Sequence, residues 1–147
     1  MTSPIRNQAK RRGTTLVEMS IVLAACLFSL LAIFEYGRYV MLRHLLDTAA
    51  REGARLAVVN TQTLTTGDIQ AKVNSYLYNE PVNLSSFQVY KADPATGANI
   101  GNWTDAAFGD PIAVDIQGSY TPILPGLGFL QNPVTMNAKI VMLSEAN

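Results

Sequence analysis

The sequence predicts an α+β fold with one long N-terminal helix that crosses a membrane and continues outside it, a small antiparallel sheet and one short helix. Three observations lead to this prediction. An almost uncharged apolar run lies near the N-terminus, and a stretch with heptad spacing follows it without an intervening proline. The C-terminal half then alternates between apolar and polar residues in short segments separated by Gly and Pro. A chain of 147 residues has room for one small domain beside an anchor.

The anchor is predicted at Leu16–Phe34, where Leu, Ile, Val, Phe and Ala dominate and Glu18 is the only charged residue. These 19 residues approach the ~20 that span the hydrocarbon core of a bilayer as a helix. A soluble helix this uniformly apolar would need a large protein around it, and this chain is small. We therefore expect a transmembrane helix over residues 14–35.

The charged residues around the anchor predict its orientation. The preceding segment carries four basic residues and no acidic one, namely Arg6, Lys10, Arg11 and Arg12. By the positive-inside rule, residues 1–13 form a cytoplasmic leader and the C-terminal part lies in the periplasm or outside the cell. Tyr36 and Tyr39 follow the anchor where an aromatic belt would mark the outer interface.

Residues 36–60 are predicted to continue the helix as an amphipathic extension. Six residues recur at alternating steps of three and four and form one seam: Tyr39, Leu42, Leu46, Ala49, Gly53 and Leu56. A continuous helix from Thr14 to Val59 would be about 70 Å long. The seam suits packing on the chain's own sheet and packing against a neighbouring subunit, and its spacing leaves both interpretations open.

Residues 61–147 are predicted to form a small external α+β domain. A short helix is expected at 68–78 with an N-cap at Thr66 or Gly67, and strands are expected at 86–92, 112–120 and 134–143. The polar segment 93–110 is expected to be a loop or a wide hairpin connection. The apolar Pro/Gly loop 122–133 suits a cover for the sheet core and, equally, a subunit contact.

The sequence contains little that suggests catalysis or metal binding. The formal net charge is zero, so no large field would recruit nucleic acid. Nucleophile elbows, metal-ligand spacings and phosphate-binding loops are absent, and His44 is the only histidine. Five polar residues could suggest a calcium loop but lack its spacing and suit turns better: Asp93, Asn99, Asn102, Asp105 and Asp110. We expect a protein that is not an enzyme and has no metal or cofactor.

The junction between leader and anchor carries the strongest functional signal. Gly13 closes the basic tail, and Glu18 follows five positions later. A carboxylate at mid-bilayer costs ~2.5–3.5 kcal/mol on insertion scales, so its presence needs a reason. The junction resembles the processing site of the type IV pilin superfamily, in which a membrane aspartyl prepilin peptidase cuts after Gly and a Glu is the fifth mature residue. The resemblance implies Gly13 before the cut, Thr14 as the new N-terminus and Glu18 as the assembly residue.

The N-terminal half also resembles TadE/TadG-like proteins, and above all the TadE-like minor pseudopilins of tight-adherence (Flp pilus) systems. Two short motifs carry the resemblance, Phe34–Arg38 and Ala49–Arg55. The matching residues are Glu35, Gly37, Arg38, Ala50, Arg51, Glu52, Gly53, Ala54 and Arg55. The resemblance implies a structural subunit that takes part in assembly of a Tad pilus or secretion apparatus.

The resemblance further implies partners and a location. The partners would be the prepilin peptidase, other Tad pilins and pseudopilins, the inner-membrane assembly platform and the lipid bilayer, with no nucleic acid. The chain would be a single-pass protein of the bacterial inner membrane, and a surface pilus is a second location.

Two alternatives compete with this interpretation. An uncleaved single-pass scaffold or adhesin of the cell envelope would need the anchor but would have no use for Glu18. A lipoprotein is the other alternative, because Leu23-Ala24-Ala25-Cys26 resembles a lipobox and would make the only cysteine the lipidated first residue. The apolar run that continues to Phe34 disfavours the lipoprotein, since such chains usually turn polar after the cut.

Overall fold

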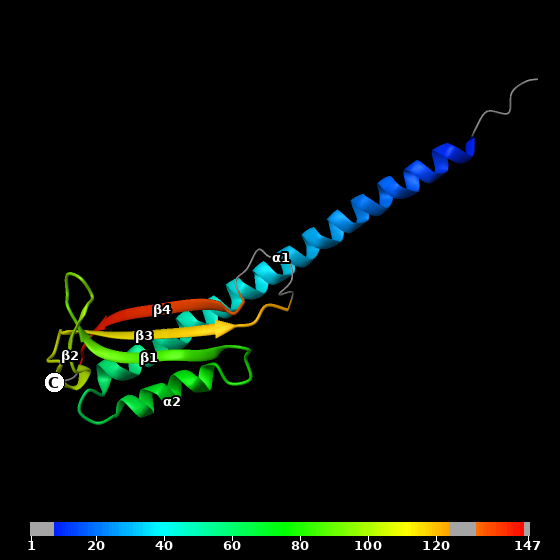
Figure 1. Ribbon diagram of the computed structural model, residues 1–147. Coiled ribbons are helices and arrows are strands. Elements are labelled where there is room, and N and C mark those ends of the chain that lie inside the picture. The colour runs from blue at the N-terminus through cyan, green and yellow to red at the C-terminus, as the bar shows by residue number, and fades with distance from the viewer. Residues whose placement is uncertain (1–7, 124–131, 146–147) are drawn as a thin grey trace, which may run out of the picture. The chain divides into compact units, whose positions relative to one another are not determined.

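The computed structural model describes residues 8–123 and 132–145, with side chains from residue 14 onward. Within this part of the chain lie two α-helices, a 3₁₀ turn and a four-stranded sheet (Figure 1). The elements in chain order are α1 (Gln8–Val59), α2 (Thr66–Tyr76), β1 (Asn83–Ala92), β2 (Asn99–Gly101), η1 (Trp103–Asp105), β3 (Pro111–Tyr120) and β4 (Val134–Leu143). The predicted α+β class is confirmed.

The chain divides into two compact units, Met1–Arg38 and Tyr39–Asn147. α1 contributes to both units, because no proline interrupts it over its 52 residues. It reaches Val59, as the heptad pattern predicts, and it begins at Gln8, ahead of the expected start at Thr14. The second unit contains the sheet, α2 and the last part of α1.

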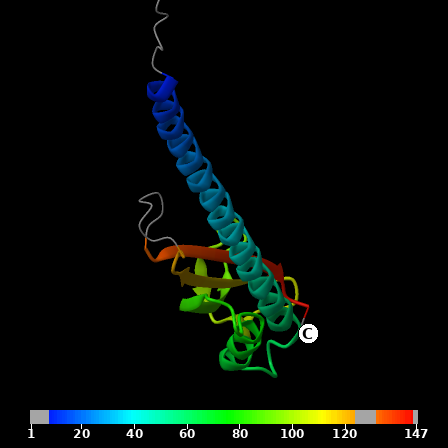
Figure 2. The same cartoon turned by 90° about the vertical axis from the view of Figure 1, so that its right-hand side faces the viewer.

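The sheet of the second unit has the strand order β2-β1-β3-β4, and each neighbouring pair is antiparallel. Short connections favour this arrangement, since antiparallel strands can be joined by turns. β3 and β4 pair in unbroken register from Pro111 opposite Leu143 to Tyr120 opposite Val134. In this unit α2 and the last part of α1 lie on one face of the sheet (Figure 2).

Alternation along β3 explains why one face of the sheet is covered. Ile112, Val114 and Ile116 are buried, whereas Asp115 is half-buried and Gln117 is exposed. The buried residues belong to cores that also contain residues of α1 and α2, such as Leu46 and Val73. The period of two therefore directs one set of side chains to the helices and the other set away from them.

Gly53 allows α1 and α2 to approach closely. A Cβ atom at this position would lie 2.7 Å from Val73 Cγ2 of α2 and 3.8 Å from Val114 Cγ1 of β3. The first distance is shorter than van der Waals contact, so the helices can pack at this separation only because the side chain is absent.

The boundaries of the external elements differ from those predicted. α2 begins at Thr66 with Thr65 as its N-cap, and it ends at Tyr76. β1 begins at Asn83, three residues before the expected start, because its pairing with β3 extends to Asn83 opposite Ser119. The segment 93–110 contains β2 and η1. Most of the loop 122–133 lies outside the described residues, so the two interpretations of it stay untested.

Candidate assembly interface

The first unit presents an apolar helix without a core of its own. An 18-residue window within the helix has a mean hydropathy of 2.4, and none of this window is buried. Every residue from Thr14 to Leu30 is exposed. A surface of this kind is stable in lipid or against other helices and not in water. The segment is therefore compatible with single-pass membrane anchoring.

Glu18 lies on this exposed helix one turn after Thr14. The interval of four residues corresponds to a rise of about 6 Å along an α-helix. Two hydroxyls on the same helix are bonded to its backbone: Ser20 Oγ donates to Leu16 O and Ser29 Oγ donates to Ala25 O, each at 2.8 Å. The backbone at Gly13 is helical, and the exposure of this residue lies outside what the structure describes.

The seam of the amphipathic extension lies against the chain's own sheet and α2. Leu42, Leu46, Ala49 and Gly53 are buried, and Tyr39 and Leu56 are half-buried. The Tyr39 ring lies 6.4 Å from the ring of Tyr120 at the end of β3, measured between centroids. Of the two interpretations that the spacing leaves open, packing within the chain is the one that this structure contains.

The residues of the two short motifs, Phe34–Arg38 and Ala49–Arg55, differ in how exposed their side chains are. Ala50, Gly53 and Ala54 are buried, together with Glu35 of the first unit. Arg38 and Glu52 are half-buried, and Gly37, Arg51 and Arg55 are exposed. A Cβ atom added at Gly37 would have no neighbour within 4 Å among the described residues.

Arg55 Nη2 lies 3.1 Å from Glu52 Oε2, in an i,i+3 ion pair on the surface of α1. Such exposed pairs contribute little to stability, about 0.3–0.5 kcal/mol.

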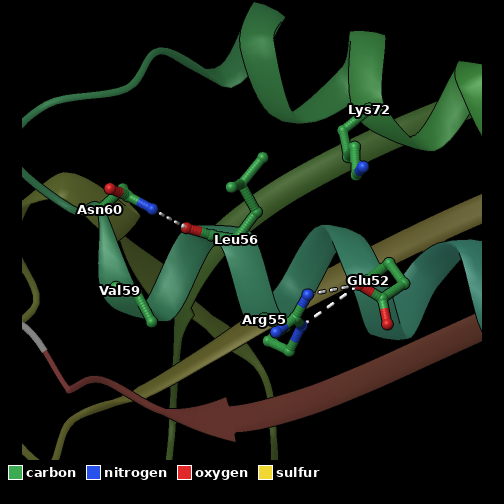
Figure 3. Close-up of a pocket in the computed structure, with 6 residues that line it drawn as sticks. All are labelled: Glu52, Arg55, Leu56, Val59, Asn60 and Lys72. Atoms are coloured by element: carbon green, nitrogen blue, oxygen red, sulfur yellow. Dashed lines mark hydrogen bonds and ion pairs between the residues drawn. The ribbon is translucent and has the colours of Figure 1, made fainter.

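A shallow hollow of about 180 Å³ lies where the end of α1 faces α2 (Figure 3). Its lining residues are Glu52, Arg55, Leu56, Val59, Asn60 and Lys72. Several of its polar groups bond to other residues of α1 and the turn after it. Asn60 Nδ2 donates to Leu56 O at 3.0 Å, and Arg55 pairs with Glu52. The Lys72 ammonium lies 5.3 Å from the centre of the Tyr76 ring. These groups stabilise the helix surface and do not converge on a ligand.

Residues 13–55 match the family model described as TadE-like protein. The N-terminal part of this chain is TadE-like. The match covers 43 of the 147 residues, so it shows that this segment is similar to the TadE-like family. It begins at Gly13, includes Glu18 and ends at Arg55. No curated protein and no solved structure matches the chain.

The TadE-like segment ends one turn before α1 does, so α2 and the whole sheet lie beyond it. Within the segment, the buried small residues Ala50, Gly53 and Ala54 pack inside the second unit, against α2 and the sheet. Glu18 and all of the segment's exposed large apolar residues except Met41 belong to the part that precedes Tyr39. One helix thus carries an exposed apolar surface and then a packing surface.

Asp93, at the start of the segment 93–110, holds a turn with its side chain. Asp93 Oδ1 accepts hydrogen bonds from Thr96 N at 2.7 Å, from Ala95 N at 2.9 Å and from the Thr96 hydroxyl at 2.9 Å. These bonds lower the pKa of the Asp93 carboxyl, the backbone bond from Thr96 most, then the bond from the Thr96 hydroxyl and then the backbone bond from Ala95.

Among the described residues, no cluster of three or more His, Cys, Asp or Glu could hold a metal ion. Cys26 and His44 are exposed on α1.

Three polar contacts that sequence reasoning missed fix the external elements. Thr65 and Asp68 form a capping box at α2, Trp103 Nε1 donates to Thr66 Oγ1 at 2.9 Å, and Lys91 Nζ lies 2.6 Å from Asp110 Oδ2. The spacing Thr65-x-x-Asp68 is a known helix-start pattern and could have located the first contact. The other two join residues far apart in the chain, and no local pattern indicates them.

Proposed function

We propose that this chain is a minor pseudopilin, a structural subunit that takes part in assembly of a Tad pilus or secretion apparatus after cleavage following Gly13. The observation that carries the proposal is Glu18, the only charged residue of the apolar run Leu16–Phe34, which lies within the TadE-like segment. An anchor alone has no use for a carboxylate that costs free energy in lipid. A subunit that must join others has such a use.

Cleavage after Gly13 would give Glu18 its partner. The cut would create an ammonium at Thr14 and remove the basic leader with Arg11 and Arg12. A Glu18 carboxylate of one subunit and the Thr14 ammonium of its neighbour are each costly in lipid, and pairing lowers the cost of both. Helices would then associate where the pair forms, and each subunit would carry its external unit to a defined position.

The membrane arrangement follows from the charges beside the anchor. The chain would sit in the bacterial inner membrane with its N-terminus in the cytoplasm, within reach of a prepilin peptidase that acts at that face. The external unit would lie in the periplasm or at the cell surface. Other Tad pilins and pseudopilins and the assembly platform would be its partners.

The N-terminus of the membrane-extracted protein tests the processing step. We expect mass spectrometry to find a chain that starts at Thr14 in cells with the prepilin peptidase and an intact leader in cells without it. A chain that starts at Met1 or Thr2 in both strains would leave an uncleaved scaffold or adhesin as the function. A lipidated chain that starts at Cys26 would make the protein a lipoprotein.

Substitution of Glu18 tests the assembly step. Glu18→Gln keeps the size of the side chain and removes its charge, so we expect normal membrane insertion and at least a tenfold loss of incorporation into the apparatus. As a matched control, Ser20→Ala changes a nearby polar residue whose hydroxyl bonds only its own helix, and incorporation should be unchanged. Normal incorporation of the Glu18→Gln protein would remove the basis of the proposal.

A further inference from the structure

Two places in the chain carry the triplet Asn-x-Ser/Thr, which is the acceptor pattern for N-linked glycans: Asn83-Leu84-Ser85 and Asn102-Trp103-Thr104. A pattern this short also occurs by chance, so the triplet alone indicates little. The deciding property is whether the asparagine amide and the hydroxyl two residues later are both open to an enzyme. The two triplets differ in this property.

The first triplet is part of the sheet. Asn83 pairs with Ser119 of β3, and Ser85 Oγ donates to Gln117 O at 3.1 Å. An enzyme that drew this triplet into its own groove would have to break these contacts, and local opening of a paired strand costs free energy. The folded chain therefore withholds this acceptor.

The second triplet follows β2 and continues into η1, outside the regular ladder. Asn102 and Thr104 are exposed, and Trp103 between them is buried. Within the described part of the chain, the side-chain amide of Asn102 makes no hydrogen bond. The Thr104 hydroxyl has one long contact, at 3.5 Å from Asp105 Oδ1. Both groups that an acceptor needs are therefore at the surface.

Trp103 holds the triplet in this arrangement. Its ring belongs to the core that contains Ile69 and Ile112, and its Nε1 donates to Thr66 Oγ1 at 2.9 Å. Because the middle residue points inward, the residues on either side of it are turned outward. Asn102 also has extended backbone angles, with φ −70° and ψ 137°. The asparagine is thus presented to solvent while the chain is folded.

The surroundings of Asn102 leave room for a sugar. A Cβ atom added at the preceding Gly101 would have no neighbour within 4 Å among the described residues. Ile100, two residues before Asn102, is 54% exposed. A sugar ring has a face of C–H groups, and contact between such a face and an apolar side chain removes apolar area from water. A glycan on Asn102 would therefore gain from its neighbours.

We propose that Asn102 is a site of N-linked glycosylation and that Asn83 is not. The inference rests on the proposed placement of the second unit outside the cytoplasm, and the donor is a glycan carried on a polyprenyl pyrophosphate. The Asn102 amide nitrogen bonds to C1 of the first sugar and loses a proton. The C1–O bond to the pyrophosphate breaks, and polyprenyl pyrophosphate leaves with the bonding electrons. The glycan then covers β2, an edge strand, with a bulky hydrated group that hinders pairing with another chain.

Mass spectrometry of the full-length protein from envelopes of its own host tests the site. Trypsin separates the two triplets, since cleavage after Lys91 leaves Asn83 in the peptide 73–91 and Asn102 in the peptide 92–139. We expect the peptide 92–139 to carry a glycan that fragmentation places on Asn102, and the peptide 73–91 to be unmodified. An unmodified peptide 92–139 would overturn the proposal. A glycan on Asn83, or on a Ser or Thr in place of Asn102, would also overturn it.

A pair of variants at Thr104 tests the role of the hydroxyl. Thr104→Val keeps the size of the side chain and removes the hydroxyl, so we expect complete loss of the glycan although Asn102 itself is unchanged. Thr104→Ser keeps the hydroxyl and should keep the glycan. A glycan that persists in the valine variant would contradict recognition of this triplet.

The location of the second unit is measured separately, by its cleavage with protease added to spheroplasts. If the second unit is cleaved and Asn102 is unmodified, this inference fails alone. If the second unit is protected, the external placement fails and this inference fails with it. Neither leader cleavage nor Glu18 takes part in glycan transfer, so a missing glycan on an external second unit leaves the pseudopilin role standing.

Discussion

Gly53 and Ala49 are buried in the seam of α1. At Gly53 the second unit brings Val73 to within 2.7 Å of where a Cβ would stand. Ala49 is fully buried in the same core. Small residues on a helix can serve contact between chains or contact within one chain, and here they serve the chain's own α2 and sheet.

Gly53→Ala should therefore destabilise the second unit by about 1–3 kcal/mol, because Val73 must shift to accept the methyl group. Urea unfolding followed by fluorescence of Trp103, which is buried and the only tryptophan, measures this change. Gly37→Ala is the matched control, since no atom lies within 4 Å of its added Cβ. An unchanged midpoint for Gly53→Ala would mean that α1 and α2 separate more easily than the structure indicates.

Asp110 couples several segments at the end of the sheet. The side-chain bond from Lys91 and then the backbone bond from Ala107 lower the pKa of its carboxyl. A lowered pKa in the folded state means that this contribution to stability is present above the ordinary value of 3.8 and is lost as the pH falls through the folded pKa.

We expect the wild-type melting temperature to fall as the pH drops below about 4, and we expect Asp110→Asn to lose part of this dependence. The asparagine keeps the shape but cannot pair with Lys91 as an anion. Differential scanning calorimetry of both proteins across this pH range checks the prediction. Parallel curves for the two proteins would show that Asp110 does not contribute to the acid transition.

At the scale of elements, α2 begins where Thr65 and Asp68 bond to each other's backbone N–H groups. Thr65 N lies 2.9 Å from Asp68 Oδ2, and Asp68 N lies 3.4 Å from Thr65 Oγ1. A helix of 11 residues is marginal by itself. The cap stabilises its start, the burial of Ile69 and Val73 holds it against α1, and the bond from Trp103 to Thr66 connects it to η1.

Thr65→Ala removes the side-chain acceptor of the cap and should cost about 1 kcal/mol of unfolding free energy. Urea unfolding measures the difference. Thr63→Ala is the matched control, because Thr63 lies in the preceding turn and its hydroxyl bonds only Asn60 Oδ1 at 3.3 Å. If both variants lose equal stability, the cap is not what begins the helix.

At the scale of the whole molecule, the two units differ in how much of their apolar surface is exposed. The first presents apolar residues that the described structure leaves exposed, and the second buries a core of apolar residues between its helices and its sheet. The second unit includes enough of α1 to complete its core, because Leu42 and Leu46 belong to it.

We therefore predict that a fragment from Tyr39 to the C-terminus is soluble without detergent and unfolds cooperatively, whereas the full-length chain needs detergent. Circular dichroism melts and sedimentation of both proteins check this. A fragment that starts at Ala50 is the control, since it lacks Leu42 and Leu46 and should lose cooperative unfolding. Aggregation of the fragment from Tyr39 would show that the core depends on the apolar helix.

The sequence by itself determined the class of the fold, the long helix through Val59, the apolar segment with Glu18, and β4 from Val134 to Leu143. These features depend on periodicity and composition, which residues near each other in the chain set. Only the tertiary structure decided that the seam packs against α2 and the sheet, that segment 93–110 holds β2 and η1, and that Lys139 lies over the ring of Tyr90. Each of these depends on residues far apart in the chain, and local patterns cannot report which distant segments meet.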